Sequence, residues 1–197
     1  MKKFIENPWF SILYNPSKTV SYILNTNPKM GFFFLSSIWF LEFFFIYICF
    51  FGFPFHVSFF LVLLLAALLS PFLGALGIFI FSAVLYIFSK MFKGEAKFSH
   101  IKTITALSKT PYVFSLILWF SLSFFALDMI IDSNKLLDSK HFIIIISICT
   151  TIWSFIILLF SQKQIQKFSV LKSFISISLS YLLILTSLFL ILFISIK

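Results

Sequence analysis

Charged residues are scarce in this chain of 197 residues: Asp, Glu, Lys and Arg together make up 11% of it, and arginine is absent. Apolar residues make up 61%, and the mean hydropathy is +1.11. A soluble domain carries about 25% charged residues. The composition therefore excludes a soluble core and predicts an all-α integral membrane protein.

Cysteine is almost absent as well. The two cysteines, Cys49 and Cys149, both fall inside apolar runs, and their spacing is not that of a metal site or a structural disulfide. The sequence also lacks HExxH, a Walker loop, GxSxG and a glycine-rich dinucleotide fingerprint. These absences do not exclude an enzyme, but they nominate no catalytic residue, no metal and no cofactor.

Acidic residues number only 6 against 15 basic ones, which gives a net charge of +9. In a soluble protein such an excess would favour nucleic acid as a partner. Here the lysines lie between the apolar runs, so we expect membrane lipid headgroups as partners and no nucleic acid.

The apolar runs predict a bundle of five transmembrane helices, residues 31–197, behind an interfacial lead-in, residues 1–30. In the lead-in, Asn15 and Pro16 predict the start of a short amphipathic helix, because these residues favour helix starts. A second short helix, with Ser99 as its cap, is expected in the longest loop. The spans are predicted at about residues 31–51, 57–89, 112–131, 142–160 and 174–196.

The lysines also predict the orientation of the chain. Twelve lie in the lead-in and in the loops that follow the second and fourth spans, and three lie in the segments of the opposite side. Cytoplasmic segments collect lysine. The N-terminus is therefore expected in the cytoplasm and the C-terminus outside.

The long second span contains Pro71, Gly74 and Gly77, which predict a helix break or kink. Ala66, Ser70 and Gly74 also repeat every fourth residue and form a stripe of small side chains on one helix face. Such a stripe allows another helix to approach closely. The stretch is interpreted as a packing centre, with a functional hinge or half-helix site as the alternative.

Glu42 is an ionisable residue near the middle of the first span, where a carboxylate costs roughly 2.5 to 3.5 kcal/mol to insert. Counting depth from the span ends places four hydroxyl groups at its level. Three roles stay open for Glu42: a hydrogen-bonded structural acid, a proton or ion site, and a catalytic acid. The hydroxyl groups are those of Ser121, Ser123, Thr150 and Thr151.

Polar residues also gather at the outer ends of the spans, where His56, His141, Asp128 and Asp132 are expected. A lipid-modifying site could form there, but no metal-ligand spacing connects the four residues. In the last span, serines mark one helix face, which usually indicates packing. These serines are Ser173, Ser176, Ser180 and Ser187.

Two segments resemble bacterial Yip-domain membrane proteins. The first is NPWFSILY at residues 7–14 with Asn-Pro-Lys at residues 27–29, and the second is KGEAKFSHI at residues 93–101 with Pro111 behind it. The resemblance implies a five-span fold with the N-terminus inside, in a bacterial inner membrane. Eukaryotic members of the family bind Rab-type GTPases and one another in vesicle traffic, whereas bacterial members have no settled activity.

The leading hypothesis is a non-enzymatic scaffold that organises membrane, or recruits lipid or a protein partner, through its basic cytoplasmic face; a homo-oligomer is compatible with it. The alternative is a small transporter or channel that uses Glu42 and the break at residues 71–77. The residues expected to bind a partner or lipid are Trp9, Lys93, Lys97, Phe98 and Lys102.

Overall fold

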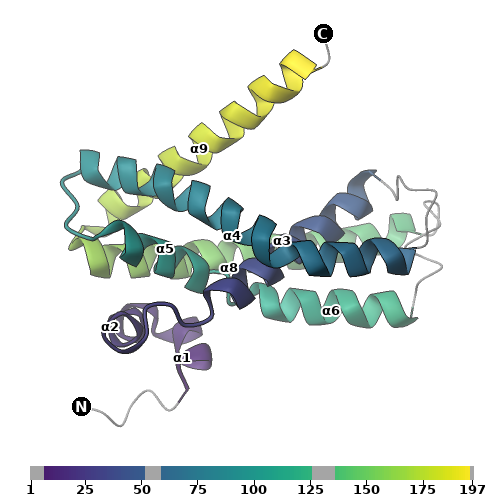
Figure 1. Cartoon of the computed structure of the whole chain (residues 1–197), viewed down its shortest axis with the longest axis horizontal. Helices are drawn as coiled ribbons and strands as arrows, with labels where there is room; N and C mark the ends of the chain where they lie inside the picture. The colour runs from purple at the N-terminus through teal and green to yellow at the C-terminus, as the bar shows by residue number, and fades with distance from the viewer. Residues whose placement is uncertain (1–6, 52–58, 126–135, 196–197) are drawn as a thin grey trace. The chain divides into compact units, whose positions relative to one another are not determined.

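The computed structural model describes residues 7–51, 59–125 and 136–195, and all regular structure in these ranges is helical (Figure 1). Each predicted span corresponds to a helix that begins and ends within several residues of the prediction. The helices are α1 (Pro8–Tyr14), α2 (Pro16–Thr26), α3 (Phe32–Phe51), α4 (Phe59–Met91), α5 (Phe98–Leu107), α6 (Tyr112–Phe125), α8 (Leu136–Gln166) and α9 (Val170–Ser195).

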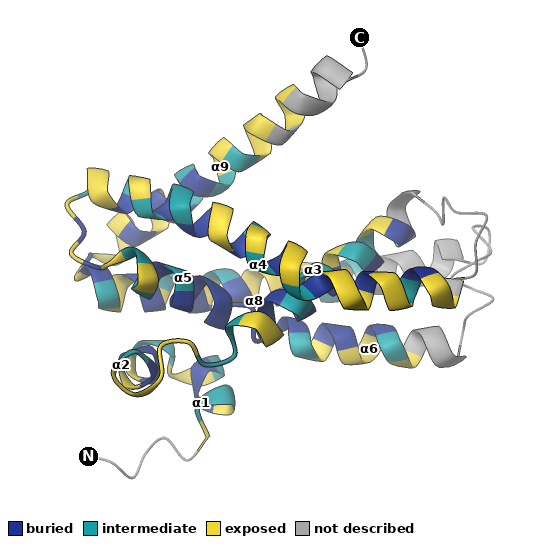
Figure 2. Cartoon of the chain, in the orientation of Figure 1, coloured by how far each residue is buried: buried dark blue, intermediate teal, exposed yellow. Residues whose placement is uncertain are grey.

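Three of the described helices are long and apolar enough to cross a membrane: Phe60–Met91, Ile144–Gln166 and Val170–Ser187. A shorter apolar helix covers Phe32–Ile48. Exposed residues recur along these helices (Figure 2), and many of them are large and apolar, as expected for surfaces that meet lipid. The chain is therefore an integral membrane protein, while the described helices leave the predicted number of five spans unconfirmed.

The chain forms two compact units. Unit 1 comprises Met1–Met30, Gly77–Thr105 and Ile157–Lys197, and unit 2 comprises Gly31–Leu76 and Ala106–Ile156. The interior of unit 2 is an apolar cluster in which the rings of Phe45 on α3 and Trp119 on α6 stack at 5.3 Å between centroids. Aromatic stacking of this kind adds about 0.5–1.5 kcal/mol to the burial of the two rings.

Within unit 1, hydroxyl side chains connect the two helices of the lead-in to each other and attach the lead-in to the rest of the unit. Ser11 on α1 and Thr19 on α2 share a buried hydrogen bond of 2.7 Å. Ser17 donates to the carbonyl oxygen of Phe160 at 3.2 Å, and Thr103 on α5 donates to that of Pro28 at 2.7 Å. The two short helices of the lead-in are therefore fixed to α5 and α8.

Of the two alternatives predicted for the second span, the helix break is wrong, because α4 is continuous from Phe59 to Met91 with Pro71 inside it. The kink at Pro71 stays a prediction. Proline has no N–H, so the carbonyl of Ala67, four residues earlier, loses its helical donor. Ser70 replaces that donor: its hydroxyl donates to the Ala67 carbonyl oxygen at 2.8 Å. Serine side chains commonly satisfy backbone groups that proline frees in membrane helices.

Candidate functional site

The loop between α4 and α5 contains the basic residues on which the predicted binding surface depends. At the end of α4 the Gly94 amide donates to the Ser89 carbonyl and the Lys93 amide donates to the Lys90 carbonyl, each at 2.9 Å. This pair of bonds closes the helix end as a Schellman motif. Lys93 takes the left-handed position of the motif, with φ of 63°, where glycine is the usual residue.

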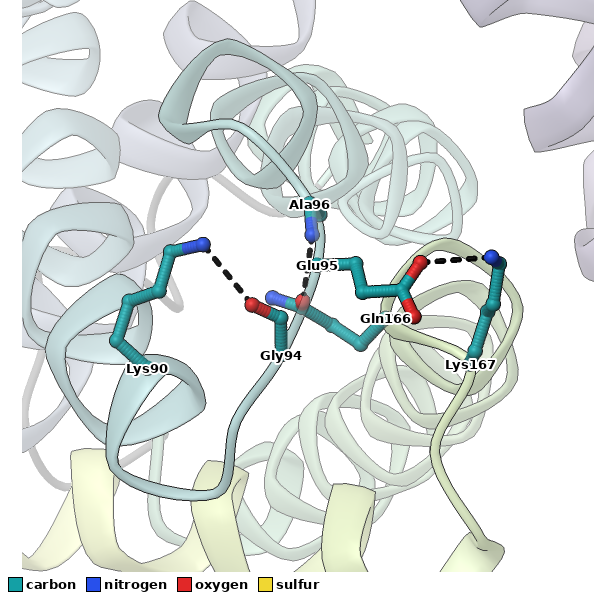
Figure 3. A network of polar contacts seen from close by, with 6 residues as sticks. All are labelled: Lys90, Gly94, Glu95, Ala96, Gln166 and Lys167. Carbon is teal, nitrogen blue, oxygen red and sulfur yellow. Dashed lines mark hydrogen bonds and ion pairs between the residues drawn. The ribbon is translucent and has the colours of Figure 1, made fainter.

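Side chains from α8 and from the end of α4 then hold the loop in place (Figure 3). The Gln166 side-chain oxygen, at the end of α8, accepts from the amide of Ala96 at 2.9 Å, and this bond is buried. A Cβ atom at Gly94 would overlap the same oxygen, so the close approach requires glycine. The Lys90 ammonium donates to the Gly94 carbonyl oxygen at 2.9 Å.

An ion pair adds to these contacts at the surface. The Lys167 ammonium lies 2.7 Å from the Glu95 carboxylate, and both side chains are mostly exposed (Figure 3). The hydrogen bond and charge of Glu95 raise the pKa of Lys167 above its usual value. Water screens an exposed pair of this kind, so the buried hydrogen bond of Gln166 is the stronger restraint on the loop.

The predicted binding residues have different environments. Lys93 and Lys97 are exposed on the loop, whereas Lys102 on α5 and Trp9 on α1 are partly buried. Phe98 packs edge-on against two rings of α4, those of Phe79 at 5.3 Å and Tyr86 at 5.8 Å. The ring contacts attach Phe98 of α5 to α4, whereas Lys93 and Lys97 remain exposed.

Lys109 differs from the other lysines of this segment because it is 5% exposed. Its ammonium lies 5.4 Å from the centre of the Trp39 ring and 5.6 Å from that of Tyr112, both in unit 2. Burial lowers the pKa of Lys109 to about 8. The sequence predicts Lys109 only as one of the twelve lysines of the cytoplasmic segments, and the structure shows that its side chain is buried.

Glu42 is buried on α3 in unit 2, as expected for an intramembrane polar residue. Its carboxylate oxygen Oε1 accepts a short hydrogen bond from the hydroxyl of Ser115 on α6, and a longer one of 3.5 Å from Ser147 on α8. The second oxygen, Oε2, has no hydrogen-bond partner among the described residues. Two neighbouring helices thus supply hydroxyl donors to one carboxyl group.

These donors are not the predicted ones. Ser121 is exposed and donates to its own helix at the Ile117 carbonyl, while Thr150 donates to the Ile146 carbonyl. Thr151 bonds the phenol of Tyr112 at 3.2 Å, and the side chain of Ser123 lies outside the described residues. Glu42 is near the middle of α3 but contacts the first turn of α6, so depth counted from the helix ends misplaced the partners.

The small residues of α4 have the packing role that the sequence indicated. Ala66, Ser70 and Gly74 are all buried in unit 2, and the backbone of Gly74 packs on the carbonyl of Ser36 in α3. Gly77 is only partly buried. The continuous helix and its packed glycine remove the half-helix site on which the transporter hypothesis relied.

The predicted outer-side site lies outside the described part of the chain. This holds for His56, Asp128 and Asp132, and for the side chain of His141 within α8. In the described ranges, no group of three or more His, Cys, Asp or Glu side chains is arranged to hold a metal ion.

The sequence interpretation missed two buried glutamines, Gln162 and Gln166. They fall in the segment interpreted as a basic linker after the fourth span, but α8 continues through it to Gln166. The one signal available was their spacing of four residues, which places both on one helix face. Of the predicted serine stripe on α9, Ser173, Ser176 and Ser180 are buried and Ser187 is exposed.

These features define an all-helical integral membrane protein with a structured basic loop between two of its helices. Residues 10–193 match the Yip1 domain. The chain therefore belongs to the Yip1 domain family, which confirms the resemblance seen in the lead-in and the loop. Comparison with curated proteins and with solved structures gave no match.

Proposed function

We propose that this Yip1 domain protein is a non-enzymatic scaffold of a bacterial inner membrane, which recruits anionic lipid or an acidic protein partner through the α4–α5 loop on its cytoplasmic side. The observation that carries the proposal is the fixed, exposed position of Lys93 and Lys97. Three contacts fix the α4–α5 loop that contains these two lysines: the Schellman cap of α4, the Gln166–Ala96 hydrogen bond and the packing of Phe98.

The charge balance of this surface supports the same proposal. Glu95 is the one acidic residue of the loop, and its carboxylate is paired with Lys167. The charges of Lys93 and Lys97 therefore have no acidic residue within the loop to offset them. A lysine near an anionic membrane surface contributes about 1 kcal/mol of attraction, so a preformed pair would favour anionic over neutral headgroups.

Lipid capture by the purified protein tests the proposal. A variant with Lys93, Lys97 and Lys102 changed to glutamine would be placed in nanodiscs that mix phosphatidylglycerol with phosphatidylcholine. Native mass spectrometry would then measure the anionic lipid that stays bound. We expect the variant to retain less phosphatidylglycerol than the wild type, with the difference shrinking at high salt, because salt screens exposed charges.

A matched control removes the same charge elsewhere. Lys18, Lys29 and Lys172 are exposed and lie outside the loop, so their change to glutamine lowers the net charge equally. We expect this control to retain more phosphatidylglycerol than the loop variant. Equal retention in both variants would show that net charge alone attracts lipid, and retention at the wild-type level in the loop variant would contradict the proposal.

A further inference from the structure

Polar side chains of three helices meet inside unit 1. Gln162 on α8 is completely buried, and its side-chain nitrogen donates to two serine hydroxyls. These are Ser89 on α4 at 2.9 Å and Ser176 on α9 at 2.7 Å. Gln166, one turn further along α8, is 1% exposed. The two glutamines thus form a polar layer among helices that are otherwise apolar.

Three atoms of this layer lack a protein partner. Gln162 Oε1, Gln166 Nε2 and Ser173 Oγ are buried without a hydrogen bond to any residue that the structure describes. Leaving a buried polar group unsatisfied costs about 1–3 kcal/mol, and the cost is higher where lipid surrounds the helices. Three such atoms in one layer indicate a bound molecule that satisfies them.

The register of α8 and α9 places these atoms at similar depth. The two helices are joined by a short turn, in which the Phe168 amide donates to the Lys163 carbonyl at 3.1 Å. Gln162 bonds Ser176, so Gln166, one turn later on α8, is level with Ser173, one turn earlier on α9. Neither atom of this second pair, Gln166 Nε2 or Ser173 Oγ, makes a hydrogen bond to the other or to any residue that the structure describes.

We propose that Gln162, Gln166 and Ser173 form a buried water-binding site. The bound molecule accepts a hydrogen bond from Gln166 Nε2 and donates one to Gln162 Oε1, while the Ser173 hydroxyl serves as donor or acceptor. The three groups are uncharged, and water is the small neutral molecule that offers donors and acceptors together. Because Gln166 Oε1 also accepts from Ala96, this water connects α9 with the α4–α5 loop.

Solid-state NMR of the protein in lipid bilayers tests the site directly. The chain contains three glutamines, Gln162, Gln164 and Gln166, so ¹⁵N-labelled glutamine side chains give three assignable signals. The experiment measures how quickly magnetisation passes from water to each side-chain amide. Exposed Gln164 is the fast reference, and the buried backbone amide of Ile177 on α9 is the slow one.

We expect Gln162 and Gln166 to receive water magnetisation at rates near that of Gln164. The Ser173→Ala variant should slow the transfer to Gln166 several-fold and leave Gln164 unchanged. Unchanged chemical shifts elsewhere would show that the variant folds, and Gln164→Met serves as a control that should not affect Gln166. Transfer to Gln166 as slow as to Ile177 in the wild type, or no slowing in Ser173→Ala, would overturn the proposal.

Discussion

Gly74 on α4 packs directly on the carbonyl oxygen of Ser36 on α3: a Cβ atom at Gly74 would overlap that oxygen, and it would lie 3.3 Å from the Cβ of Phe40. The obstacle is backbone, which cannot rotate away as a side chain can. The absence of a side chain at Gly74 therefore sets how closely these two helices of unit 2 approach. Close approach matters because van der Waals packing drives helix association in lipid.

Replacing Gly74 by alanine should therefore destabilise unit 2. The expected cost is about 1–3 kcal/mol, the usual range for overpacking, and thermal unfolding in detergent measures it. Gly77→Ala is the matched control. Gly77 is partly exposed on the same helix, and alanine there should gain up to about 1 kcal/mol of helix propensity. Equal effects of the two variants would show that close approach at Gly74 does not limit packing.

A second prediction concerns the left-handed residue at the end of α4. Lys93 has φ of 63°, a conformation that costs a residue with a Cβ atom roughly 1–2 kcal/mol. Lys93→Gly removes this cost, so we expect a higher free energy of unfolding by about 1 kcal/mol. The same variant should bind less anionic lipid, because it loses an exposed charge.

The control for this variant is Lys163→Gly, within the last turns of α8. It removes one exposed lysine too, but from a helical position, where glycine costs about 1 kcal/mol relative to alanine. The two lysine-to-glycine changes should therefore shift the unfolding temperature in opposite directions. Shifts of the same sign would contradict the role assigned to Lys93.

The helices could be predicted from the sequence because long apolar runs bounded by polar segments leave the backbone few alternatives in lipid. Each predicted span became a helix, and Pro16 begins α2 as expected. The prediction of a helix break at Pro71 was wrong for a local reason that the sequence pattern did not reveal. Ser70, next to the proline, supplies the missing donor to Ala67.

Side-chain partners were harder to predict than helices. The partner of Glu42 depends on the axial offset between α3 and α6, which counting from the helix ends does not give. In sequence Lys109 resembles the exposed lysines before it, but the folded chain places its ammonium over the rings of Trp39 and Tyr112. Long-range packing therefore decides which polar residues are buried.

Burial of Lys109 predicts a dependence of stability on pH. Its pKa is about 8 in the folded protein, against 10.5 for an ordinary lysine. Between these values the unfolded chain binds more protons than the folded one, so stability rises with pH. The contribution of Lys109 is lowest below pH 8, where the ammonium is charged in both states, and complete above pH 10.5.

The comparison of wild type with Lys109→Met isolates this effect, since methionine retains an unbranched chain without a charge. We expect the free energy of unfolding of the wild type to rise relative to the variant as the pH increases from about 8 towards 10.5. Denaturant unfolding at a series of pH values measures the difference. A difference that does not change with pH would mean that the lysine is equally hydrated in both states.

The lysine distribution predicts the topology. Reporter tags at the N-terminus, at Glu95 and at Gln164 should indicate the cytoplasm, because lysine-rich segments stay there. Tags at Pro54, at Asn134 and at the C-terminus should indicate the opposite side. Access to a Glu95 tag from outside the cell would contradict both the five-span prediction and the proposed cytoplasmic loop.

Glu42 provides the last prediction. In Glu42→Gln the amide oxygen can still accept from the Ser115 hydroxyl, so we expect folding to be nearly unchanged. Glu42→Leu removes that acceptor and should cost about 1–3 kcal/mol, the penalty for leaving a buried hydroxyl unpaired. The added change Ser115→Ala should recover most of this loss. Thermal unfolding of the wild type, Glu42→Leu, Ser115→Ala and the double variant separates the contributions as a double-mutant cycle.

Glu42→Lys tests the same site through charge. A lysine near the middle of a membrane helix costs roughly 2.5–3.5 kcal/mol to insert, and it cannot accept the Ser115 hydrogen bond, so we expect poor assembly in the membrane fraction. A structural role requires that Glu42→Gln retain assembly and function together. If Glu42→Gln assembled normally but abolished a proton-coupled flux present in the wild type, the carboxyl proton itself would be functional, and transport would replace the scaffold as the leading hypothesis.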